Sequence, residues 1–513
     1  MNRAKIMIWL VLAAALLLPA PVHSAQAGQR VLLLYDSLAK GTAREGNVTE
    51  LQRLLAAYSM GVTLQNLNEY EKGTMASYSR VITVSNSADL PITNTAYQED
   101  MKEYKGQALF VGYQLPGQVK SELKISGSVW PGGSASLSIG SLSAVPLKAE
   151  EMPYISNNRA PHAYGTLSFG SGSRVAPYAV SGGQYTYVPY LGQGDGSAMA
   201  MAYVLRDWLG SAVKPHIYLV LKEIYPFSDL GLLEQAAESL YQSGIPFIAS
   251  IRPVFSNTDY PAMERYLEAL KIVQSRGGSI IVNAPAVRPP INSNDRTLKG
   301  KMSGFIDVLA ANGVAPLGMG AESYWTYDRE YSEAGMGFFD SAVLFPDEEI
   351  HYMEQTLASK AFGSSLYSMT PEMLQELTGT GAVPELPLKG AVTVNLPEDG
   401  AGLASLLQSL KASWMTFDDY KQEDHTVVTD THTVAVSDGV IRINGGAVNI
   451  DYVPKPVSEY YQYQEQQFQS FTRLFSVQNR FFIVVIMIAL LSLGGLLLIG
   501  RRLYRKKYWN ERI

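Results

Sequence analysis

The chain of 513 residues contains no cysteine, so disulfide bonds cannot stabilise it. Its stability must come from buried apolar surface, and a chain of this length is ample for two or more hydrophobic cores. The missing cysteine also excludes a thiol nucleophile, and no G-x-S-x-G elbow with a paired histidine is present. A formal net charge of −6 argues against nucleic acid as a partner.

Long apolar runs without charge are also rare, and two of them lie near the two ends. The first, Ile6–Leu18, follows two cations and precedes the small residues Ala25-Gln26-Ala27. This pattern predicts a secretory signal peptide over residues 1–27. An uncleaved membrane anchor is the alternative interpretation of the same run.

The second run, Phe481–Gly500, holds twenty residues without a charge. At about 1.5 Å per helical residue it covers the ~30 Å hydrocarbon core, so we expect a transmembrane helix over residues 481–500. Residues 501–513 are basic and residues 456–480 are rich in Gln and Tyr, as in a stalk. The positive-inside rule then predicts a single-pass protein of the cell membrane, with a cytoplasmic tail and the bulk of the chain extracytoplasmic.

Residues 28–120 alternate strand and helix patterns. Strands are expected at Val31–Tyr35, Val81–Val84 and Ala108–Tyr113, and a helix at Val48–Ala57. This alternation predicts an α/β domain with a parallel, flavodoxin-like sheet. Its loop Asp36–Gly46 follows the first strand but lacks G-x-G-x-x-G, so no nucleotide or flavin cofactor is expected there.

Two further stretches differ in texture from that domain. Residues 121–195 are rich in Ser, Gly, Tyr and Pro and carry short alternating runs, which predicts an accessory β-rich region. Residues 384–455 mix strand and helix patterns, and Asp438-Gly439 is typical of a hairpin turn. We therefore expect a small α+β module there.

Residues 196–380 carry the most regular pattern. Three apolar strands, "IYLVL", "IPFIASI" and "SIIVN", recur at intervals of about 30 residues with helices between them. Such winding predicts either an open parallel sheet or part of an α/β barrel. Function in parallel folds lies at the carboxyl ends of strands. The candidate binding residues are therefore Lys222, Glu223, Arg252, Asn283, Glu322, Tyr324 and Trp325.

The segments "LVLKEIYPFSDLGLLEQAAESLYQSGIPFIASIRPVF" and "RGGSIIVN" resemble the uncharacterised, membrane-anchored branch of the polysaccharide deacetylase superfamily. The flavodoxin-like segment and the C-terminal span are similar to that branch as well. The resemblance implies a deacetylase-like (β/α) partial barrel over residues 196–380. In the deacetylases an Asp and two histidines hold a metal, usually zinc, that activates water against an amide or ester.

The resemblance places the metal-ligand acid on Glu223 and the neighbouring acid on Lys222. The two histidines fall on Asn283 and Val287, so Glu223 is the one matched residue able to bind a cation. No metal site and no cofactor are therefore expected, unless the chain is active and binds zinc or another divalent metal. Lys222 and Arg252 would instead supply positive charge beside Glu223, with an ordinary rim salt bridge as the alternative.

Two functions follow from this mapping. The first is a non-catalytic, deacetylase-like protein that binds an envelope polysaccharide or an envelope assembly protein. The second is an active carbohydrate deacetylase or other glycan hydrolase with Glu223 as the candidate catalytic residue. Glu322, Tyr324 and Trp325 would suit sugar stacking and hydrogen bonding to hydroxyls, although aromatic residues in such a loop also serve as packing residues.

Overall fold

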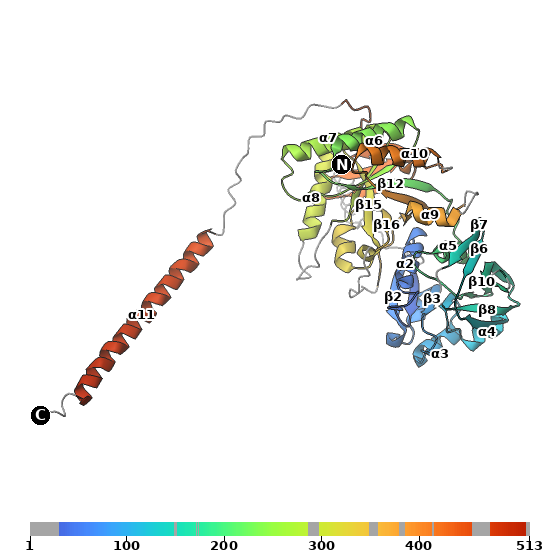
Figure 1. Ribbon diagram of the computed structural model, residues 1–513, viewed down its shortest axis with the longest axis horizontal. Coiled ribbons are helices and arrows are strands. Elements are labelled where there is room, and N and C mark those ends of the chain that lie inside the picture. The colour runs from blue at the N-terminus through green and yellow to red at the C-terminus, as the bar shows by residue number, and fades with distance from the viewer. Residues whose placement is uncertain are drawn as a thin grey trace, which may run out of the picture. The chain divides into compact units, whose positions relative to one another are not determined.

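The computed structural model describes residues 30–147, 151–170, 172, 174–285, 297–347, 358–378, 385–412, 415–453 and 472–508. The chain divides into two units, residues 1–457 and 458–513 (Figure 1). The predicted signal peptide and Val287 lie outside the described residues.

A nine-stranded sheet forms the N-terminal part of the first unit, in the order β2-β1-β3-β4-β11-β10-β9-β6-β7. The strands are β1 (Arg30–Tyr35), β2 (Gly61–Asn66), β3 (Arg80–Ser85), β4 (Gln107–Gly112), β6 (Ala135–Ile139), β7 (Leu142–Leu147), β9 (His162–Phe169), β10 (Arg174–Gly182) and β11 (Tyr185–Val188). The first five in the sheet order are parallel, and their order is typical of flavodoxin-like sheets. Most of the predicted accessory β-rich region therefore continues this sheet with antiparallel strands, and β5 (Ile125–Trp130) pairs with β8 (Met152–Asn158) beside it.

Helices cover both faces of this sheet. Successive residues of β1 alternate between two hydrophobic clusters, with Leu33 in one and Leu32 in the other. Helices α2 (Asn47–Ala57) and α5 (Gly196–Leu209) contribute to the cluster of Leu33, and α3 (Thr95–Glu103) and α4 (Gly117–Leu123) to that of Leu32. Burial on both faces explains why the strands are continuous apolar runs.

The second half of the first unit is a closed parallel barrel, β12-β13-β14-β15-β16-β17-β18. Its strands are β12 (Ile217–Ile224), β13 (Ile248–Ile251), β14 (Ser279–Asn283), β15 (Pro316–Glu322), β16 (Ser341–Phe345), β17 (Ser364–Met369) and β18 (Gly390–Asn395). The helices around it are α6 (Leu230–Gln242), α7 (Pro261–Ser275), α8 (Thr297–Ala311), α9 (Pro371–Thr378) and α10 (Gly400–Ala412).

The predicted partial barrel is thus a closed one, and it runs past the boundary placed between residues 380 and 384. Strand β18 pairs with both β17 and β12, so it satisfies the hydrogen-bonding groups of two strands that would otherwise be edges. The start of the predicted α+β module therefore belongs to the barrel.

A small sheet of β19 (His425–Val428), β20 (Thr433–Ser437), β21 (Val440–Ile443) and β22 (Gly446–Ala447) completes the first unit. The predicted hairpin turn at Asp438-Gly439 joins β20 to β21, and both turn residues have positive φ, 51° and 76°. The segment that leads into β19 fills the amino end of the barrel, because Glu423 accepts a hydrogen bond from Tyr218 on β12. The opposite, carboxyl end is the mouth of the barrel, formed by the strand ends that carry the predicted site residues.

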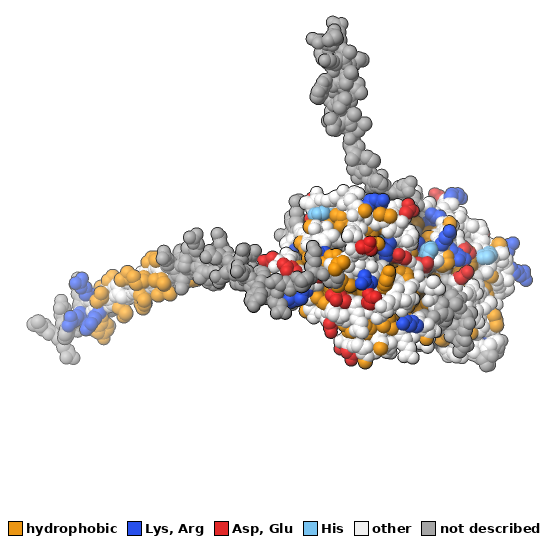
Figure 2. All heavy atoms as spheres, turned by 90° about the horizontal axis from the view of Figure 1, so that it is seen from above, with side chains coloured by type: hydrophobic (Ala, Val, Ile, Leu, Met, Phe, Trp, Pro, Cys, Tyr) orange, Lys and Arg blue, Asp and Glu red, His pale blue; other side chains and the backbone are white. Residues whose placement is uncertain are grey.

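The second unit consists, in its described part, of helix α11 (Thr472–Tyr508). Its segment Phe482–Arg505 is long and apolar enough to cross a membrane, in agreement with the predicted span. Figure 2 shows apolar side chains along this helix. The predicted stalk is helical from Thr472 onward, and residues 456–471 lie outside the described part.

Candidate functional site

Strand register fixes which residues face the interior of the barrel. Ser250 on β13 lies against the position of an added Cβ on Gly320, across the barrel on β15, so both face inward. Asn283 is the register partner of Gly320 and faces inward with it. Lys222 faces inward too, because Val220, two residues earlier, pairs with Ile248, two residues before Ser250.

Two of these inward positions, Lys222 and Gly320, lie against one aromatic ring, and Ser250 lies beside Gly320. The Nζ of Lys222 lies 4.3 Å from the centroid of the Phe345 ring. A Cβ added to Gly320 would lie 2.8 Å from that ring and 2.9 Å from the Ser250 Oγ. Only glycine leaves room here for the approach of Phe345, and the mouth of the barrel holds a cation, a hydroxyl and an aromatic ring together.

Two buried polar atoms at this mouth have no hydrogen-bond partner within the described residues. They are the Oγ of Ser250 and the Nδ2 of Asn283. Ser250 is fully buried and Asn283 is 3% exposed. An unpaired buried polar group costs about 1–3 kcal/mol, so each position is unfavourable for folding alone.

Glu223 stands at the rim rather than inside. Its φ is +59°, a left-handed conformation that costs energy for a residue with a side chain. The register of β12 against β13 shifts between Leu221 and Ile224, which marks a β-bulge around Glu223. The bulge turns the carboxylate toward Arg252, whose Nη2 lies 2.9 Å from Glu223 Oε1.

The Glu223 carboxylate is fully engaged at the rim. The Tyr225 hydroxyl donates to its Oε2, and Arg252 Nη1 donates to the backbone oxygen of Ala284 at 2.7 Å. Burial works against ionisation, but the hydrogen bond from Tyr225 and the charge of Arg252 outweigh it and lower the pKa of Glu223. The three charged residues that were predicted to lie together therefore occupy two places. Glu223 and Arg252 form an ion pair at the rim, and Lys222 lies over the Phe345 ring inside the barrel.

Sequence reasoning missed an aromatic pair at the same rim. The rings of Tyr225 and Phe227 stack at 4.8 Å with an interplanar angle of 20°. Phe227 is 81% exposed, although an apolar ring gains nothing from water. Both residues directly follow β12 at its carboxyl end, and this position in the sequence could have revealed them.

The loop after β15 behaves differently from the prediction. Trp325 in the 3-10 turn η4 (Ser323–Thr326) is only 1% exposed and stacks on Tyr331 at 4.6 Å. This placement favours the packing role that was the alternative for the aromatic residues of this loop. Tyr324 is half-buried within the electrostatic reach of Arg252, and burial raises the pKa of its hydroxyl. Glu322 ends β15 on the inward face and already has an interaction partner.

The residues described at this mouth do not fit a zinc ion. Both oxygens of Glu223 accept hydrogen bonds, and the unpaired atom of Asn283 is an amide nitrogen, which donates. Nowhere in the described ranges do three His, Cys, Asp or Glu side chains form a group that could hold a metal ion. We therefore derive no step through a metal.

The loop after β1 is organised by a carboxylate of the chain itself. Asp36 accepts hydrogen bonds from the backbone N–H groups of Ser37, Asn86 and Ser87 and from the Ser85 hydroxyl. These donors lie at the carboxyl ends of β1 and β3, where flavodoxin-like sheets bind ligands. Asp36 occupies them, which leaves no free anion cradle at this point.

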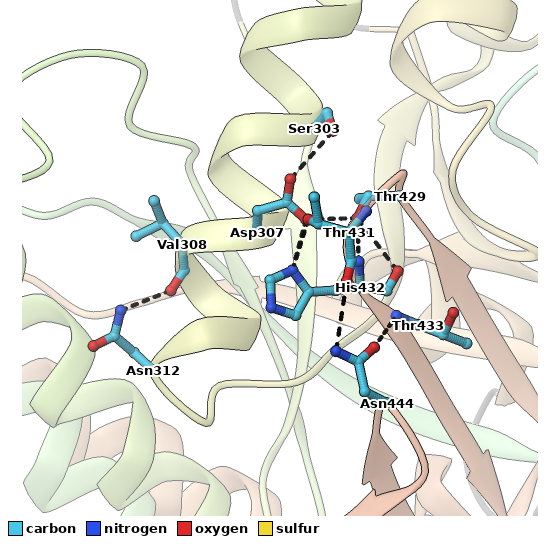
Figure 3. A network of polar contacts seen from close by, with 9 residues as sticks. All are labelled: Ser303, Asp307, Val308, Asn312, Thr429, Thr431, His432, Thr433 and Asn444. Atoms are coloured by element: carbon cyan, nitrogen blue, oxygen red, sulfur yellow. Dashed lines mark hydrogen bonds and ion pairs between the residues drawn. The ribbon is translucent and has the colours of Figure 1, made fainter.

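A second polar network lies away from the mouth of the barrel (Figure 3). His432 Nδ1 lies 2.9 Å from Asp307 Oδ1, and the hydroxyls of Thr429 and Ser303 also donate to this carboxylate. Asp307 belongs to α8, and Thr429 and His432 lie between β19 and β20. The network therefore joins the small sheet to the barrel and has a structural role.

Comparison with known protein families finds no match. "Uncharacterized protein YdaL" of Bacillus subtilis (strain 168) is 40% identical over 92 residues, which cover 17% of this chain and 16% of that protein. Two solved structures are each 12% identical over 40% of this chain. They are the Bc1960 peptidoglycan N-acetylglucosamine deacetylase, with 86% of its chain covered and a TM-score of 0.24, and a Mycobacterium smegmatis protein described as a polysaccharide deacetylase, with 87% and 0.23. Scores this low carry no argument about the fold, and the barrel is defined here by its own strand pairing.

Proposed function

We propose that this chain is a membrane-anchored, extracytoplasmic, deacetylase-like protein that binds an envelope polysaccharide at the mouth of its barrel without hydrolysing it. The observation that carries the proposal is the exposed ring of Phe227, stacked on the partly buried Tyr225 beside the ion pair Glu223–Arg252. Sequence resemblance to the deacetylase superfamily and the closed parallel barrel support it.

The rim has the chemistry that a sugar ring needs. The apolar C–H face of a pyranose packs on an aromatic ring such as Phe227, and its hydroxyls need donors and acceptors close by. The Glu223–Arg252 pair places such groups at the rim, and sugar hydroxyls would compete for the hydrogen bond that joins the two side chains. We favour a glycan over an assembly protein because one exposed ring, that of Phe227, is small beside the roughly 800 Å² per partner of a stable protein interface.

Binding without hydrolysis follows from the state of Glu223. A carboxylate whose pKa is lowered by Tyr225 and Arg252 is a weak base and is not protonated near neutral pH. A binding role therefore suits Glu223 better than a role as general acid, and the described residues contain no group of three His, Cys, Asp or Glu side chains that could hold a metal.

The membrane assignment combines two segments. The predicted signal peptide would export the chain, and Phe482–Arg505 would then hold it in the membrane with the basic residues after it in the cytoplasm. The barrel would in this way lie on the side of the membrane that holds the envelope polysaccharide.

The test is retention of the full-length protein, in detergent micelles, on insoluble peptidoglycan and on chitin. Phe227→Ala should lower retention about 5- to 10-fold, as expected for loss of an aromatic contact worth about 1–1.5 kcal/mol. Tyr241→Ala is the matched control, because Tyr241 is also exposed but lies near the end of α6. Equal retention of wild type and Phe227→Ala would contradict the proposal.

A second measurement separates binding from catalysis. Wild-type protein should release no acetate from N-acetylglucosamine oligomers, with or without added zinc. Acetate release that is lost in Glu223→Gln would instead establish the alternative, an active carbohydrate deacetylase or other glycan hydrolase.

A further inference from the structure

We infer that the mouth of the barrel recognises a carboxylate of an acidic sugar, held by Lys222, Ser250 and Asn283. The inference rests on the proposed function, since it names the class of glycan that this rim binds. It is carried by hydrogen-bond donors of the mouth that have no acceptor within the described residues.

Three donors face the same interior. Lys222, Ser250 and Asn283 lie on neighbouring strands β12, β13 and β14, and the register turns all three inward near their carboxyl ends. The ammonium of Lys222 has three N–H donors, and the Nδ2 of Asn283 is a donor with no acceptor role. The Ser250 hydroxyl is free to donate, so the group is rich in donors.

No anionic acceptor of the described residues pairs with this group. Lys222 forms no ion pair within the described ranges, and its charged end instead lies over the Phe345 ring. Both oxygens of Glu223 are engaged at the rim, and Glu322 already has a partner. Among the residues that the structure describes, no carboxylate therefore pairs with these donors.

This arrangement costs free energy until a ligand supplies the acceptor. Unpaired buried donors are unfavourable, and a cation over an aromatic ring is attracted less strongly than by an anion. An acceptor with two oxygens would pair with Asn283 and Ser250 and neutralise Lys222. The part of the site that is unfavourable in the free protein would then become favourable in the complex.

The charge balance selects a carboxylate. Arg252 is neutralised by Glu223, which leaves Lys222 as the cation that faces the interior at this level. One cation matches a monoanion, whereas a phosphate near −2 would retain an uncompensated charge in a poorly hydrated place. A uronic acid also has a ring to stack on Phe227 at the rim while its carboxylate points inward.

The test compares two probes that differ in one charge per residue, tetragalacturonate and its fully methyl-esterified form. Full-length protein in detergent micelles is titrated with each by calorimetry. Wild type should bind the acid at least 10-fold more tightly than the ester, and the preference should weaken as sodium chloride is raised, because salt screens the Lys222 charge. Equal affinity for both probes would overturn the inference.

Variants locate the preference. Lys222→Met and Asn283→Leu should each lower affinity for the acid and leave affinity for the ester unchanged, and Lys72→Met, on the exposed pair with Glu99, should change neither. Circular dichroism checks folding, and the salt dependence of wild type tests the charge even if a variant fails to fold. Displacement of tetragalacturonate by inorganic phosphate but not by free galacturonate would also overturn the inference that the site recognises a carboxylate.

The two failures differ. If Phe227→Ala still lowers retention on peptidoglycan while acid and ester bind equally, the proposed glycan binding stands and the carboxylate inference falls. If Phe227→Ala is silent for every probe, the proposed function falls and the inference falls with it.

Discussion

The guanidinium of Arg53 lies 4.3 Å above the centroid of the Tyr367 ring and forms a 2.9 Å ion pair with Glu50. Arg53 and Glu50 belong to α2 of the N-terminal sheet, whereas Tyr367 belongs to β17 of the barrel. The Tyr367 hydroxyl donates to Glu50, and Arg53 Nη2 donates to the Ser368 carbonyl at 2.7 Å. All four residues are buried, so this network fixes the sheet against the barrel.

Arg53→Met should therefore destabilise the protein strongly. The substitution leaves the charge of Glu50 buried without a partner, which typically costs about 3–5 kcal/mol. The double variant Glu50→Leu/Arg53→Met should recover part of that loss, because no unpaired charge then remains. The measurement is the urea midpoint by tryptophan fluorescence, and a midpoint of Arg53→Met equal to that of wild type would show that the network contributes little.

The sequence predicts the strands of both sheets well, because apolar runs such as "RVLLLY" and "IYLVL" are buried on both sides. It does not predict how the barrel closes. Strand β18 lies far along the chain from β12, and its "GAVTVN" pattern also suits a small separate module. Closure depends on pairing between distant segments, which no local pattern contains.

The site was predicted in part for the same reason. Strand ends locate Lys222, Glu223 and Arg252 at the mouth, as parallel folds require. The pattern does not reveal the bulge, which turns Glu223 to the rim while Lys222 stays inside. Nor does it reveal that Trp325 packs on Tyr331. The 3-10 turn Ser323–Thr326 directs the Trp325 ring into the core, and the order of residues in the sequence does not show this direction.

Tyr225→Phe should raise the pKa of Glu223. Burial favours the neutral acid, and the Tyr225 hydroxyl is the strongest influence against it. A lowered pKa contributes stability above the ordinary value of about 4.3, and that contribution is lost as pH falls through the folded-state pKa. In Tyr225→Phe the loss on acidification should be smaller and should end at higher pH, as urea midpoints between pH 3 and 7 would show. Superimposable profiles for wild type and variant, with Tyr241→Phe as control, would refute this.

Asp307→Asn should weaken the attachment of the small sheet to the barrel at neutral pH. Burial opposes ionisation of Asp307, but hydrogen bonds from Thr429, Thr431 and His432 lower its pKa. The stability it contributes is present above its ordinary pKa of about 3.9 and lost on acidification. The difference between wild type and variant should therefore be large at pH 7 and small at pH 3. Limited proteolysis of both proteins at the two pH values measures this difference in stability. A difference that grows toward pH 3 would contradict the prediction.

Protease added to intact protoplasts should digest the chain before Phe482. The basic residues that follow the apolar segment favour the cytoplasm for the tail, and the sheets would then lie outside. An epitope tag after Ile513 should survive on a short fragment, whereas disruption of the membrane should expose it. Complete protection of the chain in intact protoplasts would contradict this topology and place the sheets in the cytoplasm.

Glu423→Gln should separate stability from binding. Glu423 accepts hydrogen bonds from Tyr218 at 2.6 Å and Ser364 at 2.7 Å and forms a 2.8 Å ion pair with Lys389. A neutral amide leaves Lys389 without its counter-ion and brings an N–H group toward hydroxyl donors, so we expect a loss of about 3 kcal/mol by urea unfolding.

Glycan retention on peptidoglycan should nevertheless stay within about two-fold of wild type, since Glu423 fills the amino end of the barrel and the proposed site is at the other end. Phe227→Ala should show the opposite pattern, with normal stability and weak retention, because its ring is exposed and supports no core. If Glu423→Gln lowers stability but not retention, and Phe227→Ala lowers retention but not stability, then glycan binding takes place at the carboxyl end of the barrel. Loss of retention in a folded Glu423→Gln protein would move the binding site away from that mouth.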